Sequence, residues 1–338
     1  MTVRGAKSVT VPPAGKACLW IFTAAGPRIG FGHLRRCIIL AEKMSGFADP
    51  LFLLGSPNPD SRRLLRSGGY RFLAGAAGRA WKSLALPSAI LLDTRICRGP
   101  ERLISAARKR GVPLVSIHDL GLNPMPSDVV IDGSILPGPA TYGGTRYMVL
   151  DPAYRDLNQK PRKLGKTIRS VFVNLGGGYS TKLLPAVLEG LKLWGRPIRV
   201  SAPRGFASWG RKRLRSRDWR PLRFRWELRG PHAALSGADL AITAGGLSAY
   251  EALCAGTPTL ALSCDSWQQK TVSALARAGA CVNLGPGGEL DSKSLAALVG
   301  QLDRDRVLRR TLSRRGRKTV DGRGAERVSG IIRNLIRA

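Results

Sequence analysis

Short apolar runs alternate with amphipathic stretches along the first half of the chain, and the run ACLWIFT occupies residues 17–23. Further apolar runs lie at 50–55 and 89–93, and residues 33–44, between the first two runs, carry apolar side chains at helical spacing. Continuous apolar runs of this length are typical of strands buried on both faces of a parallel sheet. Strands that alternate with helices predict an α/β fold with a parallel, doubly wound sheet.

The same alternation restarts in the second half, after a polar, proline-bearing stretch at residues 151–170. Strand-like runs followed by glycine turns lie at 170–178 (SVFVNLGGG) and 238–246 (ADLAITAGG). The chain is therefore predicted to hold two α/β domains of similar size joined by a linker. The expected segments are a flexible leader at 1–15, a first domain at 16–156, a linker at 157–169, and a second domain at 170–338 that ends in a basic helix.

Composition adds little to the fold but limits the class of protein. The chain has 338 residues, of which 43% are hydrophobic, and no apolar run approaches the roughly 18–20 residues needed to span a bilayer. The six cysteines are scattered without a C-x-x-C pair, which favours reduced thiols over disulfides or a zinc site. The first fifteen residues lack the apolar core of a signal peptide, so a cytoplasmic protein is expected.

The formal net charge of +33 indicates anionic partners. Two segments are dense in this charge: residues 204–229, where arginines are interleaved with tryptophans, and residues 304–338. Such segments stack on nucleic acid bases, lie on an anionic membrane surface, or form a solvated basic face, and the pattern alone leaves the three open. No recognised nucleic-acid motif is present, so a non-catalytic nucleic-acid-binding protein is the least favoured class.

Three glycine-rich turns follow predicted strands, and each is a candidate anion site because backbone N–H groups and a helix dipole point at a ligand there. The first carries Gly26, Gly30 and Gly32, the second is NLGGGYS at 174–180, and the third is TAGG at 243–246. The first turn lacks the G-x-G-x-x-G spacing, and the strand after it lacks a terminal acid to hold a ribose. A nicotinamide cofactor is therefore not expected, and no other cofactor is indicated.

The third turn is followed by a polar pair whose spacing has two interpretations. Ser248 falls in the first turn of the predicted helix, and Glu251 lies three residues further on. A glutamate there would repel a phosphate, but it could reach the diol of a ribose beside it. The same spacing is that of a capping box, in which the serine and glutamate satisfy the backbone at the helix start. Spacing alone leaves both interpretations open.

His33, one of three histidines in the chain, stands at the mouth of the first glycine turn. A histidine with its ordinary pKa of about 6.5 is a competent general base at neutral pH. The alternative is a residue that bonds the backbone at the start of a helix, and the residues alone favour that alternative.

The segment GPRIGFGHLRRCIILAEKM at 26–44 resembles the IGxGHxxRCLxLA segment of the nucleotide-sugar hydrolases of pseudaminic acid synthesis and their spore-coat polysaccharide relatives. The segment ADLAITAGGLSAYEALCAGTPTLAL at 238–262 resembles the nucleotide-binding segment of that family, a pattern shared more loosely with the lipid-II-forming N-acetylglucosaminyltransferase. Segments between them resemble the family in the same order, so that the likeness runs from about 18 to 300. These segments are ILLDTR, VSIHDLG, YGGTRYMVLDPAYR and VFVNLGGGYS.

The resemblance implies a GT-B fold, in which two Rossmann-like domains with doubly wound parallel sheets face each other across a cleft. It implies that UDP lies against the second domain, that the reacting sugar faces the first, and that His33 activates the attacking water. The resemblance also implies that Asp93 joins His33 as a catalytic residue and orients either the histidine or a sugar hydroxyl. The residues implied in UDP and sugar binding are Gly30, Gly32, Arg36, Asp119, Gly176, Gly177, Gly245, Gly246, Ser248, Glu251 and Gln268.

No metal is implied, because helix dipoles and basic groups neutralise the departing diphosphate in such a site. The sequence Asp-Arg-Asp at 303–305 has the letters of a D-x-D metal motif. It lies among arginines in a predicted helix, and we expect it to form a solvated face.

The chain departs from the family pattern at three places near the implied substrate. Thr94 and Arg95 follow Asp93 where the family has tyrosine two positions on, His118-Asp119 replaces a double aspartate, and Trp267-Gln268 replaces an Asn-Gln pair. The leading hypothesis is a UDP-sugar hydrolase of the pseudaminic-acid-pathway type. The alternative is an inverting GT-B glycosyltransferase that uses a UDP-sugar at an anionic membrane surface, because the same scaffold transfers sugars when an acceptor hydroxyl replaces water.

Overall fold

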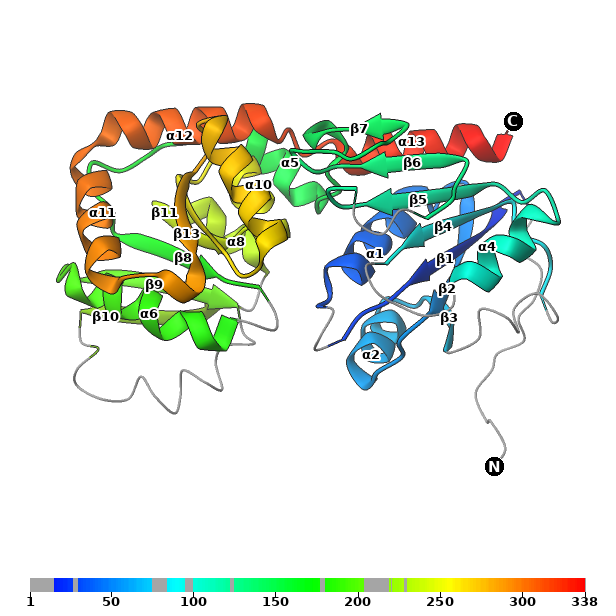
Figure 1. The fold of residues 1–338 in the computed structure, drawn as a ribbon, viewed down its shortest axis with the longest axis horizontal. Helices are drawn as coiled ribbons and strands as arrows, with labels where there is room; N and C mark the ends of the chain where they lie inside the picture. Colours follow the sequence, from blue (N-terminus) through cyan, green and yellow to red (C-terminus); the bar gives the residue numbers. More distant parts are fainter. Residues whose placement is uncertain are drawn as a thin grey trace. The chain divides into compact units, whose positions relative to one another are not determined.

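Each half of the chain folds around its own parallel sheet in the computed structural model (Figure 1). Contacts divide the chain into unit 1, within residues 1–133, 137–149 and 324–338, and unit 2, within residues 134–136 and 150–323. The structure describes residues 15–26, 30–74, 84–94, 100–121, 125–176, 180–203, 219, 221–227 and 230–337.

Unit 1 is built on a sheet of strand order β3-β2-β1-β4-β5-β6-β7, in which every pairing is parallel. The chain winds outward in one direction from β1 to β3 and in the other from β4 to β7, so the order reverses between β1 and β4. In sheets of this kind ligands bind beyond the carboxyl ends of the strands at that reversal. The strands are β1 Ala17–Thr23, β2 Ala48–Leu54, β3 Arg71–Ala74, β4 Ala89–Asp93, β5 Leu114–His118, β6 Val129–Asp132 and β7 Tyr142–Gly143.

The sheet of unit 1 is buried on both faces, which explains the continuous apolar runs. In β1, Leu19 and Ile21 belong to one core cluster, together with residues of α1 and α13, while Trp20 and Phe22 belong to another with residues of α4. All four side chains are fully buried. The helical segments of unit 1 are α1 Gly32–Met44, α2 Pro59–Ser67, α4 Pro100–Arg108, the 3₁₀ turn η1 Thr145–Tyr147, and α13 Gly324–Arg337.

Unit 2 repeats the design with a parallel sheet of order β10-β9-β8-β11-β12-β13, whose order reverses between β8 and β11. One continuous core cluster joins its central strands to α6 and α11. The strands are β8 Ser170–Asn174, β9 Ile198–Pro203, β10 Leu222–Glu227, β11 Leu240–Ala244, β12 Thr259–Ser263 and β13 Val282–Pro286. The helical segments are α5 Pro152–Gln159, α6 Ser180–Leu193, α8 Pro231–Gly237, α9 Leu247–Cys254, α10 Ser266–Arg277, η4 Gly287–Glu289, α11 Ser292–Arg304 and α12 Arg306–Thr319.

Three parts of the sequence prediction differ from the structure. The polar stretch at 151–170 is not all linker, because α5 forms within it. Asp151 caps this helix by accepting from the Ala153 N–H at 2.9 Å, Pro152 supplies a favourable first residue, and Tyr154 is buried. A short helix with so few apolar positions gives too weak a periodic signal to be distinguished from a loop.

The basic C-terminal helix, which the sequence placed with the second domain, belongs to unit 1. Its apolar face packs on α1, and Val328 and Ile332 are fully buried in the same core cluster as Leu34. The helix starts at Gly324, where a Cβ would collide with the Met148 carbonyl. Of the arginines of this helix, Arg327 donates to the Arg146 carbonyl at 2.7 Å, Arg333 lies over the Phe47 ring, and Arg337 is exposed.

The Asp-Arg-Asp sequence at 303–305 was expected on a solvated face, and this expectation is wrong. Asp303 is buried, accepts from the Ile168 N–H at 2.6 Å and pairs with Arg196 at 3.1 Å. Asp305 caps α12 by accepting from the Leu308 N–H at 2.8 Å. Both carboxylates are therefore structural. No helix in the described ranges is both long and apolar enough to cross a bilayer.

The packing of α13 yields a stability prediction for unit 1. Replacing the fully buried Ile332 with alanine removes apolar contacts and leaves a cavity, so we expect the free energy of unfolding to fall by about 2–5 kcal/mol. Urea unfolding of purified Ile332→Ala and Asn334→Ala measures this, because Asn334 is exposed on the same helix. Equal stability of the two variants would show that α13 does not depend on this contact.

Candidate active site

The first glycine turn positions the start of α1 beside the reversal of the unit 1 sheet. Gly26 and Gly30 exchange two backbone hydrogen bonds, of 3.1 and 2.7 Å, which close the loop after β1. Gly30 has φ of +81°, a conformation that favours glycine. Gly32 is the first residue of α1, so His33 falls in the first turn of that helix.

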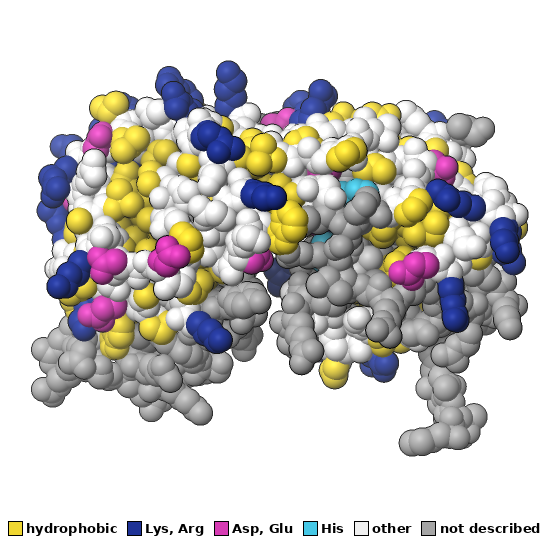
Figure 2. Space-filling model, in the orientation of Figure 1, with side chains coloured by type: hydrophobic (Ala, Val, Ile, Leu, Met, Phe, Trp, Pro, Cys, Tyr) yellow, Lys and Arg dark blue, Asp and Glu magenta, His cyan; other side chains and the backbone are white. Residues whose placement is uncertain are grey.

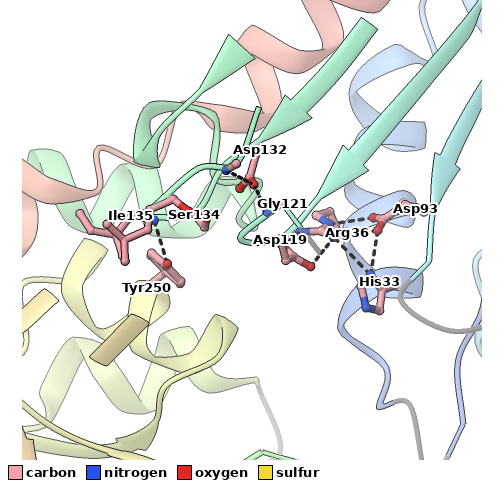
Figure 3. Close-up of polar contacts among 12 residues, drawn as sticks. His33, Arg36, Asp93, Asp119, Gly121, Asp132, Ser134, Ile135 and Tyr250 are labelled. Atoms are coloured by element: carbon pink, nitrogen blue, oxygen red, sulfur yellow. Dashed lines mark hydrogen bonds and ion pairs between the residues drawn. The ribbon is translucent and has the colours of Figure 1, made fainter. Parts of the chain in front are cut away.

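His33 pairs with Asp93, the last residue of β4. Its Nδ1 lies 2.8 Å from Asp93 Oδ1 (Figure 3). Burial alone would raise the pKa of Asp93, but the charge of Arg36 and the hydrogen bonds from Arg36 and His33 hold it well below its usual range. An ionised carboxylate only accepts hydrogen bonds, so we assign the proton of the neutral imidazole to Nδ1. The other ring nitrogen, Nε2, is then the acceptor.

Arg36 ties two carboxylates together. Its Nε and Nη2 donate to the two oxygens of Asp93 at 2.7 Å each, while Nη1 and Nη2 donate to Asp119 at 2.8 and 3.1 Å. The side chain is only 7% exposed, and four of its five N–H groups are used in this way. Burial opposes its charge, but the two carboxylates raise the pKa of Arg36 well above its usual range. Its implied contact with substrate stays a prediction.

Asp119, directly after β5, is the accessible member of the cluster. Its side chain is 38% exposed, whereas that of Asp93 is fully buried. Burial would raise its pKa, but the charge of Arg36 lowers it, so Asp119 is a carboxylate held at a fixed position with part of its surface open. Such a group can accept hydrogen bonds from a ligand.

His118 is placed differently from His33. It is buried, and its Nε2 lies 2.9 Å from Ser116 Oγ and accepts from the Met125 N–H at 3.3 Å. Burial lowers the pKa of His118, so the neutral ring is favoured. These contacts are those of a hydrogen-bonded core histidine.

Asp132 was missed by the sequence reasoning. It ends β6, is fully buried, and accepts from the Gly121 N–H at 2.7 Å and the Gly138 N–H at 3.0 Å (Figure 3). It thereby fixes the loop that follows Asp119. The signal was present, since an acid at the end of an apolar strand also marked Asp93.

The third glycine turn, in unit 2, contains two glycines with different environments. The Gly245 N–H donates to the Leu262 carbonyl at 2.9 Å, and a Cβ at Gly245 would lie 2.5 Å from Val272. Gly245 therefore lets α10 pack closely, and its amide is already used. Gly246 is the N-cap of α9, and a Cβ there would meet nothing within 4 Å.

The capping-box interpretation of Ser248 and Glu251 does not hold. The N-cap residue is Gly246, and no side chain caps the helix. Within the described chain, the N–H groups of residues 246–248 have no hydrogen-bond partner. Glu251 is half-buried beside Tyr154, and burial together with this carboxylate raises the pKa of the tyrosine well above its usual range.

The structure describes only some of the remaining residues that were predicted to bind the nucleotide in unit 2. The side-chain oxygen of Gln268 accepts from the Cys264 N–H at 3.1 Å, which leaves its amide NH₂ for other partners. Gly176 is exposed, with φ of +81°, at the end of β8. Gly177 lies outside the described residues. Tyr250, one residue before Glu251, accepts from the Ile135 N–H at 3.1 Å (Figure 3).

The chain matches no protein-family model. It is similar to the spore coat polysaccharide biosynthesis protein SpsG of Bacillus subtilis, with 30% identity over 198 residues that span 57% of this chain and 58% of that protein. The match thus covers little more than half the length of that relative.

Solved structures give a likeness over nearly the whole chain. MurG of Acinetobacter baumannii aligns with a TM-score of 0.69 and 17% identity, over 94% of this chain and 99% of that one. The spinosyn rhamnosyltransferase SpnG in complex with thymidine diphosphate aligns with a TM-score of 0.63 and 17% identity, over 94% and 99% of the two chains. Together with the two parallel sheets, this likeness shows that the chain has the GT-B fold.

Within the described ranges, no three His, Cys, Asp or Glu side chains gather as a metal ion would require. The prediction that no metal takes part stays a prediction.

The Arg36–Asp93 pair yields a prediction on stability and pH. Because the folded state lowers the pKa of Asp93, the stability it supplies is complete above the ordinary aspartate pKa of about 4 and is lost as pH falls below it. Asp93→Asn leaves the buried Arg36 with one carboxylate, so we expect a loss of about 3 kcal/mol at pH 7 and a weaker decline in acid. Urea unfolding from pH 7 to pH 3 measures both.

Asp119→Asn is the matched control, because Asp119 bonds the same guanidinium but is partly exposed. We expect it to cost only about 1 kcal/mol. Equal losses from the two variants would contradict the assignment of Asp93 as the buried anchor.

Proposed function

We propose that the chain is a nucleotide-sugar hydrolase that cleaves a UDP-sugar, of the pseudaminic-acid-pathway type, by attack of water at the anomeric carbon. The observation that carries the proposal is the His33–Asp93 pair at the carboxyl edge of the unit 1 sheet, with Nε2 as its acceptor nitrogen. The GT-B fold and the likeness to a polysaccharide biosynthesis protein support a nucleotide-sugar substrate.

His33 acts as the general base in this mechanism. Its Nε2 takes a proton from water as the water oxygen bonds to the anomeric carbon, and the bond from that carbon to the diphosphate oxygen breaks. UDP leaves with the electron pair, and the configuration at the carbon is inverted. Asp93 holds the ring by Nδ1 and stabilises the imidazolium that forms, as in other acid–histidine pairs.

Arg36 and Asp119 have supporting roles. Arg36 is a positioning residue, since its guanidinium holds the Asp93 carboxylate ionised and oriented toward His33. Asp119 is the accessible carboxylate of the cluster and accepts from a sugar hydroxyl. The Gly30–Gly32 turn allows the sugar to approach the backbone closely.

The nucleotide is assigned to unit 2. The N–H groups of residues 246–248 and the dipole of α9 bind the diphosphate, and Glu251 accepts from the ribose. Gly176 is assigned near the diphosphate, Gly177 is assigned there by the family resemblance alone, and the NH₂ of Gln268 contributes a donor. The N–H of Gly245 does not bind the diphosphate, because it already donates to the Leu262 carbonyl. Gly245 contributes only to the shape of the turn.

A second candidate is an inverting glycosyltransferase that uses a UDP-sugar at an anionic membrane surface. The likeness to MurG and to a rhamnosyltransferase favours it. The same His33–Asp93 pair would then take the proton of an acceptor hydroxyl. The two candidates differ in one measurable respect: the hydrolase releases UDP in water alone, and the transferase requires an acceptor.

The base assignment is tested by His33→Ala. Loss of the base should lower UDP release from the preferred UDP-sugar by about 10²- to 10⁴-fold, while the thermal shift caused by UDP stays that of the wild type. Arg35→Ala, an exposed change in the same helical turn, should leave turnover unchanged. A panel of UDP-sugars without acceptor, followed by UDP detection, provides the assay, and turnover that survives in His33→Ala refutes the assignment.

The nucleotide site is tested by Gly246→Val. The backbone there has φ of −95°, which valine adopts, and its Cβ meets no atom, so the fold should persist. The added methyl groups should prevent close approach of the diphosphate and abolish the UDP thermal shift. Gly237→Val, another glycine whose Cβ meets nothing, is the control. A wild-type UDP shift in Gly246→Val would exclude this turn.

A further inference from the structure

A basic pocket in unit 2 has no part in the proposed reaction. It measures about 390 Å³, within the size range of small-molecule sites, and is lined by α5, α12 and the segment between α5 and β8. Five of its eight lining residues are cationic and none is acidic. The cationic residues are Arg162, Arg310, Arg314, Arg317 and Lys318.

The pocket lies at the opposite edge of the unit 2 sheet from the glycine turns. Arg162 donates to the carbonyls of Leu235, at 2.8 Å, and of Ser236, at 2.7 Å, at the end of α8 just before β11 begins. The glycine turn at 245–246 follows the other end of β11. A five-residue strand spans about 16 Å, so the pocket is separate from the predicted diphosphate site.

Two arginines form the fixed base of the pocket. Arg162 is held by carbonyls at the end of α8, and Arg317 donates to the carbonyl of Asn158. Asn158 in turn donates to the carbonyls of Cys254, Arg317 and Val320, which ties α5 to α9 and α12. Carbonyls orient the guanidinium groups but carry no charge to balance them.

The electrostatic environment of Arg162 shows the resulting repulsion. Burial and the charge of Arg317 lower the pKa of Arg162, and only Asp239 opposes them. The Asp239 carboxylate is already bonded to the backbone N–H groups of Arg169 and Ser170. The two positive charges are therefore held close together, and among the described residues Asp239 is the one carboxylate that acts on Arg162.

The outer part of the pocket is formed by side chains free to move toward a ligand. Arg310, Arg314 and Lys318 occur at intervals of four along α12, which places them on one face of the helix. They are exposed and form no ion pair or hydrogen bond with any described residue. Lys and Arg side chains project over α12 in the space-filling view (Figure 2).

We propose that this pocket binds a phosphate-bearing ligand, either a free phosphate compound or a phospholipid headgroup, at a site distinct from the proposed UDP site. Oriented guanidinium groups bind phosphate oxygens in pairs, and a ligand of two or more negative charges balances the repulsion among the five cations. The three exposed side chains close on the ligand, and the two anchored arginines fix its position. The proposal does not depend on the hydrolase assignment.

The test compares two triple variants with the same change in charge. Arg310→Ala/Arg314→Ala/Lys318→Ala removes the exposed part of the pocket, and Arg277→Ala/Lys293→Ala/Arg304→Ala removes three exposed cations of unit 2 that do not line it. All six side chains are exposed, so both variants should fold, which circular dichroism verifies. Each is compared with the wild-type full chain in two arms.

The first arm titrates sodium pyrophosphate by calorimetry at constant ionic strength, with the wild type and both variants carrying Gly246→Val so that the predicted nucleotide turn does not bind it. The second arm measures sedimentation with phosphatidylglycerol vesicles and with phosphatidylcholine vesicles. We expect the pocket variant to weaken binding at least tenfold in one arm, and the control variant by less than twofold. A loss in the pyrophosphate arm identifies a soluble ligand, and a loss in the vesicle arm alone identifies a headgroup.

Equal weakening of binding by the two variants would show that only the net charge matters, and it would refute the proposed site. Absence of wild-type binding in both arms would overturn it as well. Failure of the hydrolase proposal would appear elsewhere, as UDP-sugar turnover unaffected by His33→Ala.

Discussion

The site in unit 1 depends on one buried guanidinium held between two carboxylates. Asp93 has no exposure to water, and a carboxylate in that position is stable as an anion only with a cation bonded to it. Arg36 supplies this cation, and it lies three residues after His33, so both side chains leave the same face of α1. The spacing H-x-x-R therefore places on one helix both the proposed base, His33, and the guanidinium that keeps its partner ionised, and the end of β4 places the Asp93 carboxylate between them.

The two units use the same sheet topology for different chemistry. In unit 1 the reversal of strand order lies between β1 and β4, and ionisable side chains gather beyond it. In unit 2 the reversal lies between β8 and β11, and the edge beyond it offers backbone N–H groups at a helix start. In the proposed reaction, titratable groups suit the proton transfer, and backbone amides at a helix start suit a diphosphate that gains negative charge as it leaves. One fold pattern thus supplies both the proposed proton-transfer site and the proposed anion site.

The sequence predicted the features that local patterns encode. The parallel strands were evident because they are apolar on both faces. Asp93 ends such a strand, but the roles of His33 and Asp93 came from the family resemblance, since the residues alone favoured a helix-start role for His33. The contacts of arginine were not predictable. Arg36 and Arg309 are both buried: Arg36 binds carboxylates, and Arg309 binds the carbonyls of Gly165 and Lys166. In the sequence, both occupy ordinary polar positions of a helix. Partners more than fifty residues away leave no trace in local spacing, and the same limit hid Asp303 and the docking of α13.

The excess of positive charge has a structural explanation in part. Arg162, Arg309 and Arg317 use their guanidinium groups to bind backbone carbonyls at the ends of helices and in loops, and the planar groups of Arg162 and Arg309 each reach more than one carbonyl. The carbonyls satisfy the N–H groups but carry no net charge, and Asp239 and Asp303 are the carboxylates that act most on Arg162 and Arg309, respectively. Arg162 and Arg317 also repel each other, and an anion bound between them would relieve that repulsion. The structural use of arginine in unit 2 therefore creates the conditions for an anion site, and the exposed basic side chains of α12 lie where that site opens to solvent.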